Sequence, residues 1–571
     1  MKKVGKVKKI DFSRKRLSSM ADNFYNEGKY LSALKFAYKE ASEYGMDIDV
    51  FIRLADIYEG MNLQGMALNW WFRCLDSAEL DDLPDIYEGI AVNFLAMGQE
   101  SQAAYYYNKL IDSDDTIPEE VKLDIAEAFS NSPKDKFRFS YPPELVDYSE
   151  ELKSGAKALK AGNCKSAIEI LSSVSKESKQ YVQAKEMEAV ARLLAGEVKE
   201  AEEACQALLA VEPNDVRALA TLAAVYLEQG RKEESKALAY RLSEMDSDDA
   251  DELYKIATVC CENELHEAAY KKFKILDQKT PYDGRVLYFK GVSAYKCGKI
   301  ECAIEALNEL CTIYPDAAVA KYYLAELHRY QNEGGDAPEL IYFYHLPQEE
   351  RENRCSLLIH MSKCAREEAE LFAFLAMQEN YFEWCFDEMD GGDHELQYLA
   401  LVAAVKAGID GFLRRVLLDY EVLDVLKLET LRMLIERNEE MEIGVVLCSI
   451  YKRLFLPRIS IGRKRRKKFI EAFAKVASKF IVIKETYGER LKRAAEALYR
   501  ALEGYNSLDL VDNPDDCACA IYMLAGLKEL GDNPEVIAAA FEANVDRVKV
   551  LLSAAVSNDF GVKKENEDET Y

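Results

Sequence analysis

The chain has 571 residues, of which 49% are apolar and 31% charged, and its formal net charge is −27. This length exceeds the roughly 250–300 residues over which a single hydrophobic core grows, so several domains or one elongated solenoid is expected. The 27 glycines and 13 prolines leave little room for a many-stranded β architecture. No apolar run approaches the roughly 18 residues that span a bilayer, and an acidic body repels nucleic acid.

The chain begins with a basic tail, residues 1–16, whose net charge is +7. The tail lacks the apolar stretch of a secretory signal, so we expect a cytoplasmic protein. The 14 cysteines agree with this location, because they are scattered along the chain and form no CxxC pair. We expect them to be reduced and to serve as small apolar residues. The composition is typical of a bacterial cytosolic protein.

Residues 17–112 contain three copies of a helical hairpin, which form block 1. Small residues recur in each first helix and again in each second helix: Ala21, Ala55 and Ala91, then Ala33, Ala67 and Ala103. Apolar residues within a hairpin are three or four positions apart, which is the period of an α-helix. Residues 113–148 then break the repeat, and because Pro133, Pro142 and Pro143 stop helices we predict a connector there.

Residues 149–335 form block 2, where the hairpin recurs at a fixed step of 34 residues. Three columns follow this step. Small residues of the first helices are Gly155, Ala189, Ala223, Ala257, Gly291 and Ala325. Small residues of the second helices are Ala167, Ala201, Ser235, Ala269 and Ala303. The helix-ending column is Gly162, Gly196, Gly230, Glu264 and Gly298, with Gly28 and Gly98 in block 1. Such glycines suit the left-handed residue that ends many helices. A period near 34 predicts stacked hairpins, five here with a capping helix.

These columns resemble the tetratricopeptide repeat, which has a small residue at position eight and glycine near position fifteen. The repeat also has alanine at position twenty, a large apolar residue at position twenty-four and proline at its end. Matching residues include Ala223, Tyr226, Gly230 and Phe273, with Pro213, Pro281 and Pro315 at repeat ends. The resemblance covers about half the chain. It implies an all-α, right-handed α-solenoid that acts as a scaffold for protein or peptide partners.

By this resemblance, residues of the first helices line a groove that holds an extended peptide or a partner helix. The groove positions of the later repeats are Tyr254, Thr258, Tyr288, Val292, Tyr295 and Tyr322. Tyrosines offer a large contact area with few rotatable bonds, which favours an apolar or aromatic ligand. The alternative is that they only fill gaps between repeats, and both interpretations carry equal weight. Family members that bind chaperone tails use a carboxylate clamp with asparagine at position nine. Here that column has no asparagine, so the clamp is missing and we do not expect a chaperone tail as the ligand. Its residues are Ala156, Val190, Ala224, Thr258 and Val292.

After block 2 the 34-residue step fades, although helical spacing continues. We interpret residues 336–455 as a degenerate helical-repeat segment, in which EIGVVLCSIYKRL is one of the amphipathic helices. Residues 456–468 are a basic linker that ends in RKRRKK, residues 469–558 form a C-terminal helical domain, and residues 559–571 form an acidic, disordered tail.

Within the C-terminal domain, DNPEVIAAAFEANVDRVKVLLSAA predicts two helices joined by a tight turn, with Asn544 capping the second. This segment resembles a helix-turn-helix unit or the end of a cyclin-box repeat. It departs from that pattern at Glu542, which replaces the usual turn glycine. The alternative function is therefore a regulator whose basic C-terminal part binds nucleic acid or an acidic partner. The candidate contacts are Arg463, Lys464, Arg465, Arg466, Lys467, Lys468, Arg547 and Lys549.

Motifs of enzymes and metal sites are missing from the sequence. It contains no GxGxxG, GxxxxGK[ST] or GxSxG motif, and its five histidines form no cluster at ligand spacing. We therefore expect no catalytic residues, no cofactor and no metal. The favoured hypothesis is a cytoplasmic scaffold that binds partners through its repeat grooves.

Overall fold

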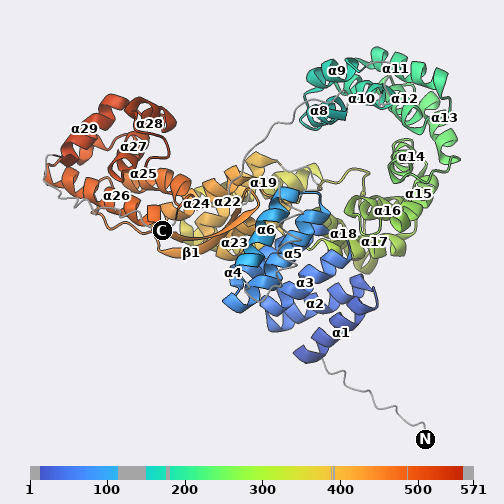
Figure 1. The fold of residues 1–571 in the computed structure, drawn as a ribbon. Helices are drawn as coiled ribbons and strands as arrows, with labels where there is room; N and C mark the ends of the chain where they lie inside the picture. The colour runs from blue at the N-terminus through green and yellow to red at the C-terminus, as the bar shows by residue number, and fades with distance from the viewer. Residues whose placement is uncertain are drawn as a thin grey trace, which may run out of the picture. The chain divides into compact units, whose positions relative to one another are not determined.

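The structure is a computed structural model (Figure 1), which describes residues 13–113, 149–174, 181–387, 389, 393–484 and 486–556. Most of the predicted connector, most of the basic tail and the acidic tail lie outside these residues. The described part is almost entirely α-helical, which confirms the all-α solenoid class. It includes one small sheet, which the sequence did not predict.

The repeat blocks are built from paired helices. The helices of block 1 are α1 (Arg14–Asn26), α2 (Tyr30–Tyr44), α3 (Ile48–Gly60), α4 (Gln64–Ser77), α5 (Leu83–Ala96) and α6 (Glu100–Ser113), with a 3₁₀ turn η1 (Leu80–Asp82). The helices of block 2 are α8 (Ser149–Lys160), α9 (Cys164–Ser172), α10 (Tyr181–Leu194), α11 (Val198–Val211), α12 (Val216–Glu228), α13 (Lys232–Ser243), α14 (Ala250–Glu262), α15 (His266–Lys279), α16 (Gly284–Lys296), α17 (Ile300–Ile313) and α18 (Ala318–Glu333).

The rest of the chain is helical apart from one β-hairpin. Its elements are α19 (Gln348–Lys363), α20 (Arg366–Gln378), α21 (Tyr381–Cys385), α22 (His394–Ala407), α23 (Asp410–Leu418), α24 (Asp424–Glu436), β1 (Met441–Leu447), β2 (Ile450–Leu456), α25 (Arg466–Phe480), α26 (Thr486–Gly504), η3 (Leu508–Leu510), α27 (Pro514–Leu524), α28 (Pro534–Ala540) and α29 (Val545–Val556).

The described residues belong to two compact units. One unit contains block 1 together with residues 352–382 and the chain from residue 393 onward. The other contains block 2, the chain up to residue 351 and a return segment that includes residues 383–387. Block 1 is therefore grouped with the C-terminal half of the sequence rather than with the repeats that follow it.

The turn inside each repeat hairpin depends on a residue with positive φ. The predicted glycine column has this conformation throughout, as in Gly28 (φ 70°) and Gly230 (φ 73°). Glu264 and Asn62 occupy the same column and adopt φ values of 61° and 58°. The repeat geometry thus imposes the left-handed conformation even where glycine is missing, and glycine adopts it at lower cost.

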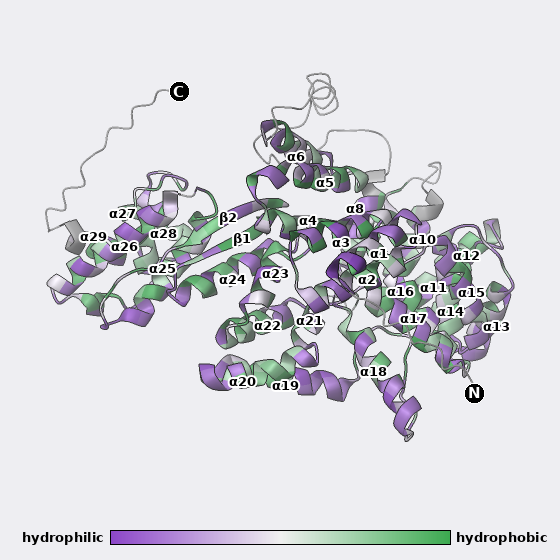
Figure 2. Ribbon diagram, turned by 90° about the horizontal axis from the view of Figure 1, so that it is seen from below, coloured by the Kyte–Doolittle hydropathy of each residue, from purple (hydrophilic) through white to green (hydrophobic). Residues whose placement is uncertain are grey.

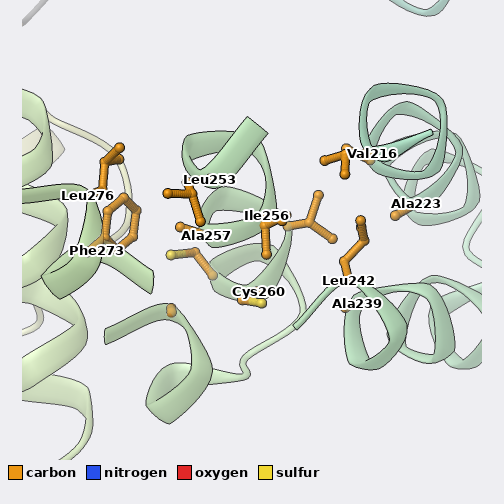
Figure 3. Close-up of a cluster of buried hydrophobic side chains, with 14 of the residues drawn as sticks. Val216, Ala223, Ala239, Leu242, Leu253, Ile256, Ala257, Cys260, Phe273 and Leu276 are labelled. Carbon is orange, nitrogen blue, oxygen red and sulfur yellow. The ribbon is translucent and has the colours of Figure 1, made fainter. Parts of the chain in front are cut away.

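The small residues of the columns lie in the core between neighbouring helices, except Ala325 of α18, which is exposed. Ala223, Ala257 and Ala269 are fully buried, and they belong to one apolar cluster that spans helices α12 to α16. Figure 3 shows part of this cluster, with Phe273 at one side. Because alanine carries only a methyl group, the two helices of a hairpin and the next hairpin can pack closely together.

Replacing Ala257 with leucine should overpack this cluster. We expect Ala257→Leu to lower the free energy of unfolding by about 1–3 kcal/mol, because the added methylenes have no space. Urea denaturation followed by circular dichroism measures the change. Lys274→Leu is the matched control, since Lys274 is exposed on α15 and leucine is also a good helix former. Equal stability of the two variants would contradict the close packing.

Residues 441–456 form an antiparallel β-hairpin, so the prediction of a helix there is wrong. Met441 pairs with Leu456 and Leu447 pairs with Ile450. The two-residue turn, Cys448 and Ser449, has positive φ at both positions (49° and 63°), as hairpins with a type I′ turn do. The segment is rich in β-branched residues, and their preference for strands outweighs the helical spacing.

The hairpin packs against block 1 through hydrogen bonds to α4 and α6. Tyr106 of α6 donates from its hydroxyl to the carbonyl of Ser449 (2.9 Å) and accepts from the amide of Tyr451 (3.1 Å). The hydroxyl of Tyr451 donates to Oδ1 of Asp76 on α4 (2.9 Å). Arg453 donates to the Asp76 carbonyl (2.7 Å). Block 1 therefore holds a distant, non-helical part of its own chain.

A substitution at Gly444 of β1 tests whether the hairpin packs on α4 in this way, because an added Cβ atom would collide with Oδ1 of Asp76. We expect Gly444→Ala to lower the free energy of unfolding by about 1–3 kcal/mol, since the carboxylate must leave Tyr451 to make room. Thermal denaturation measures the loss. Gly411→Ala is the control, because a Cβ atom at Gly411 meets nothing within 4 Å. An unchanged melting temperature for Gly444→Ala would refute the docked arrangement.

Candidate peptide-binding groove

The predicted groove tyrosines of block 2 stand on three first helices, α14, α16 and α18. Tyr288 and Val292 of α16 are fully buried. Tyr254 of α14 is half-buried and packs edge-on against the rings of Phe273 and Phe289, at 6.2 Å from each. These positions are already in contact with other parts of block 2 and of the segment that follows it.

Residues 336–347, called the strap here, run without helical structure after α18. Three even-numbered residues of the strap are buried: Leu340, Tyr344 and Leu346. Tyr342, the even-numbered residue among them, is partly buried. Phe343 between them is 64% exposed. Alternation of this kind is what an extended segment shows when one of its sides faces a protein surface.

Tyrosine hydroxyls of the first helices donate hydrogen bonds to main-chain carbonyls of the strap. Tyr288 donates to the carbonyls of Ile341 (3.1 Å) and Phe343 (3.3 Å). Tyr295 donates to the carbonyl of Pro338 (2.7 Å). Tyr323 of α18 donates to the carbonyl of His345 (3.0 Å). Because these bonds go to main-chain atoms, they hold the backbone of the strap and place little demand on its sequence.

One tyrosine of the strap, Tyr342, points back to the repeats. Its hydroxyl lies 3.0 Å from Nδ1 of His266 on α15, and Nζ of Lys296 lies 5.4 Å from the centre of its ring. Burial, helped by the nearby Cys261 thiol, raises the pKa of Tyr342. Burial and the charge of Lys296 lower the pKa of His266. Both groups are therefore neutral at pH 7.

The second tyrosine of the strap, Tyr344, is buried against Tyr288, with ring centres 4.8 Å apart in an edge-to-face arrangement. Its hydroxyl donates to Oδ2 of Asp387 (2.8 Å), and the same oxygen accepts the Val319 amide (3.3 Å). Burial, with the Asp387 charge beside it, raises the pKa of Tyr344 well above its ordinary value. Asp387 thus connects the strap to the start of α18 through two hydrogen bonds.

The groove residues predicted from the sequence are only partly brought together. Tyr288 and Tyr295 contact the strap, whereas Thr258 donates to the Lys255 carbonyl of its own helix (2.9 Å). Tyr322 packs edge-on against Tyr323 at 5.4 Å. The repeat pattern does not point to Tyr323, His266 or Asp387, which also contact the strap. The aromatic run YFYH between two prolines was the available signal for the strap.

Block 1 presents an open hollow on its first helices, with a volume of about 350 Å³. Its lining residues are Asp22, Tyr25, Asn26, Asp49, Ile52, Arg53, Asp56 and Ile57. Arg53 forms ion pairs with Asp22 (2.8 Å) and with the buried Glu40 (3.0 Å). Its positive charge is therefore neutralised by acids of block 1. Burial, reinforced by Glu59, raises the pKa of Asp56 to about 6.

The predicted basic contacts lie in the C-terminal part, where several of them pair with acids. Lys464 and Arg465 both pair with Asp509 (3.4 and 3.5 Å), and Lys468 pairs with Asp512 (2.9 Å). The run is also not an uncovered linker, because α25 begins at Arg466. The neighbouring Lys468, with Arg465 and Arg547 further away, lowers the pKa of Asp512. These pairs reduce the attraction of the run for phosphate groups.

The two predicted C-terminal helices are present as α28 and α29. The side chain of Asn544 accepts the amides of Asp546 (3.0 Å) and Arg547 (3.1 Å), as expected for a cap. Glu542 in the turn has a φ of 55°. The two candidate cations of α29 face acids: Arg547 lies 3.8 Å from Asp516, and Lys549 lies 3.5 Å from Asp546.

Within the described residues, one group of side chains has the spacing of metal ligands. Atoms of His360, Cys364 and Glu368 lie within 4.8 Å of one another at the corner between α19 and α20. Nε2 of His360 already pairs with Oε1 of Glu368 at 3.0 Å. The group mixes three residue types, so the spacing of the histidines alone does not indicate it.

Comparison with known proteins identifies the repeats. Residues 192–258 match the family model of the tetratricopeptide repeat. Block 2 therefore contains tetratricopeptide repeats. The match lies in block 2 and ends within α14, which carries Tyr254. No curated protein matches the sequence.

Among solved structures, a tetratricopeptide repeat protein from Parabacteroides merdae is similar, with 14% identity and a TM-score of 0.24; the match covers 50% of this chain and 99% of that chain. The complex of the TPR2AB domain of yeast Sti1 with pHSP90 has 14% identity and a TM-score of 0.18, covering 47% of this chain and 98% of that chain. The Cut9–Hcn1 hetero-tetramer of the APC/C has 12% identity and a TM-score of 0.25, covering 95% and 96%. In the described residues, every helix is too short or too polar to cross a bilayer.

The raised pKa of Asp56 predicts a pH dependence of stability. The folded chain holds this proton more tightly than the unfolded chain, because the pKa rises from 3.8 to about 6. The stability that this proton provides is complete below about pH 4 and is lost as the pH rises through 6. Asp56→Asn should therefore remove this dependence and raise the melting temperature above pH 6, which thermal denaturation at several pH values measures. Asp85→Asn, an exposed carboxyl on α5, should leave it in place. A native pH profile for Asp56→Asn would contradict the role of burial.

Proposed function

We propose that this protein is an interaction scaffold whose block 2 binds an extended segment of a protein partner. The observation that supports this most directly is the set of hydroxyl donors, Tyr288, Tyr295 and Tyr323, which bind main-chain carbonyls of the strap. A surface that already binds one extended segment has the donors and the apolar contacts to bind another. In this proposal the strap is the chain's own occupant of that surface.

A partner segment would follow the chemistry of the strap. The strap places Leu340, Tyr342, Tyr344 and Leu346 toward the repeats, so a partner with aromatic or leucine side chains at alternate positions fits best. This agrees with the apolar or aromatic ligand that the tyrosine columns predict. A charged partner tail fits poorly, because Tyr288 and Val292 offer no charge.

The strap limits access to the groove in this proposal. A segment tethered next to its binding surface acts at an effective concentration of about millimolar, so a free partner must bind tightly or the strap must leave. The scaffold would therefore bind weakly until a partner or another event displaces the strap.

The test uses a full-length variant in which residues 338–345 are replaced by a glycine–serine linker of equal length. A labelled synthetic peptide of residues 336–347 is then titrated with the native chain and with this variant, and fluorescence anisotropy is measured. We expect the variant to bind the peptide at least about tenfold more tightly than the native chain, because the tethered competitor is gone.

A second change identifies the donors. In the linker variant, Tyr288→Phe should weaken peptide binding by roughly 2- to 10-fold, since it removes one hydroxyl donor worth about 0.5–1.5 kcal/mol. Tyr226→Phe is the matched control, because Tyr226 lies on α12 and stacks with Arg231 outside the groove. Circular dichroism establishes that both variants are folded. Absence of peptide binding by a folded linker variant would overturn the proposal.

A further inference from the structure

Helix α20 places small residues inside and large apolar residues outside. The residues it buries are Ala369, Ala373 and Ala376. Four of its five large apolar side chains are exposed instead: Leu371 by 74%, Phe374 by 68%, Leu375 by 46% and Met377 by 50%. A single exposed leucine needs no explanation, but four such residues on one helix form a patch of the kind that marks an interaction site. Figure 2 colours the ribbon, α20 included, by the hydropathy of each residue, from purple for hydrophilic to green for hydrophobic.

Three of the exposed residues form one stripe. Leu371, Phe374 and Leu375 are spaced three and four positions apart, so they lie on one side of the helix, opposite the buried alanines. This is the spacing with which one helix anchors another. The alanine side packs against α22, so the stripe faces away from the helix that supports α20.

Acidic residues border the stripe on both sides. By helical geometry, Glu370 lies along one edge and Glu368 along the other, while Glu367 continues the line of the stripe at the start of α20 and Glu379 follows its last residue. Arg366 is the only cation of α20, and it pairs with Glu370 (2.9 Å). The stripe therefore lies in a negative field, which Glu367 and Glu379 strengthen at its two ends.

We propose that the stripe of Leu371, Phe374 and Leu375 docks an amphipathic helix of a protein partner whose apolar side is bordered by lysine or arginine. When two helices pack along an apolar seam, the residues beside the seam form pairs between them, and glutamates on one helix select cations on the other. This surface lies outside both repeat blocks, so the proposal does not depend on the groove of block 2.

The same charges disfavour two other occupants. A second copy of this helix would bring glutamates against glutamates, and such like-charge contacts are costly. An anionic membrane surface would repel the same residues. A helical partner with a basic border satisfies both the apolar stripe and its acidic edges.

The test titrates the full chain into two labelled synthetic helices at about 150 mM salt, where long-range attraction is screened beyond roughly 8 Å. Both peptides carry leucines along one side; one has lysines beside them, and its twin has glutamates. We expect the lysine peptide to bind at least about tenfold more tightly by fluorescence anisotropy. Phe374→Ser should reduce its binding at least about tenfold, as loss of a central anchor does.

Two further variants separate a specific site from general acidity. Leu80→Ser changes a leucine that is 83% exposed on η1, and it should leave binding of the lysine peptide unchanged. The double variant Glu367→Lys and Glu379→Lys should shift the preference toward the glutamate peptide. Circular dichroism of each variant ensures that the fold is retained, which these exposed positions allow.

Several outcomes would overturn the proposal. Equal binding of the lysine peptide to the native chain and to Phe374→Ser would assign the attraction to the acidic body alone. A native dimer in analytical ultracentrifugation that Phe374→Ser dissociates would assign the stripe to a second copy. Binding to vesicles containing phosphatidylserine that Phe374→Ser abolishes would assign it to a membrane.

Discussion

A buried carbonyl group of the main chain needs a hydrogen-bond donor, and a segment outside helices and sheets finds few donors in its own main chain. The strap meets this requirement with tyrosine hydroxyls, because Tyr288, Tyr295 and Tyr323 donate to its carbonyls. The β-hairpin meets it in the same way at Ser449, whose carbonyl accepts from Tyr106. Tyrosine suits this role because its ring packs in the apolar core while its hydroxyl reaches a polar atom. Both repeat blocks therefore hold irregular parts of their own chain with the same chemistry.

This use of tyrosine depends on the regular stacking of the repeats. Alanine columns such as Ala223 and Ala257 bring neighbouring helices close together, and left-handed turn residues fix the direction of each second helix. Side chains at equivalent positions then stand at regular intervals along one side of the stack. Tyr288 lies one repeat after Tyr254, and its hydroxyl bonds the carbonyls of two strap residues. The three donors, Tyr288, Tyr295 and Tyr323, occupy different positions of the repeat, so the strap depends on these individual side chains as well as on the stacking.

Basic side chains in several parts of this acidic protein form ion pairs with acids that lie next to them. Basic residues of the C-terminal run pair with Asp509 and Asp512, and Arg53 of block 1 is enclosed between Asp22 and Glu40. Arg366 has a similar role on α20, where Glu367 and Glu379 extend the negative border of the exposed apolar stripe. The hollow of block 1 and this border each carry several acids, which favour the approach of basic partner segments over acidic ones.

The sequence by itself determined the repeat architecture, because the columns of alanine and glycine act between neighbouring helices and recur with a visible period. It also indicated the cap at Asn544, since a cap depends on residues two and three positions away. It did not reveal the β-hairpin: residues 441–456 match helical spacing, and their strand pairing depends on the turn at Cys448 and on Asp76, several hundred residues earlier. Nor did it place the strap, whose donors lie on helices of other repeats, or show that α20 turns its alanines inward. Those features depend on contacts between distant segments, and only the tertiary structure decides which segments meet.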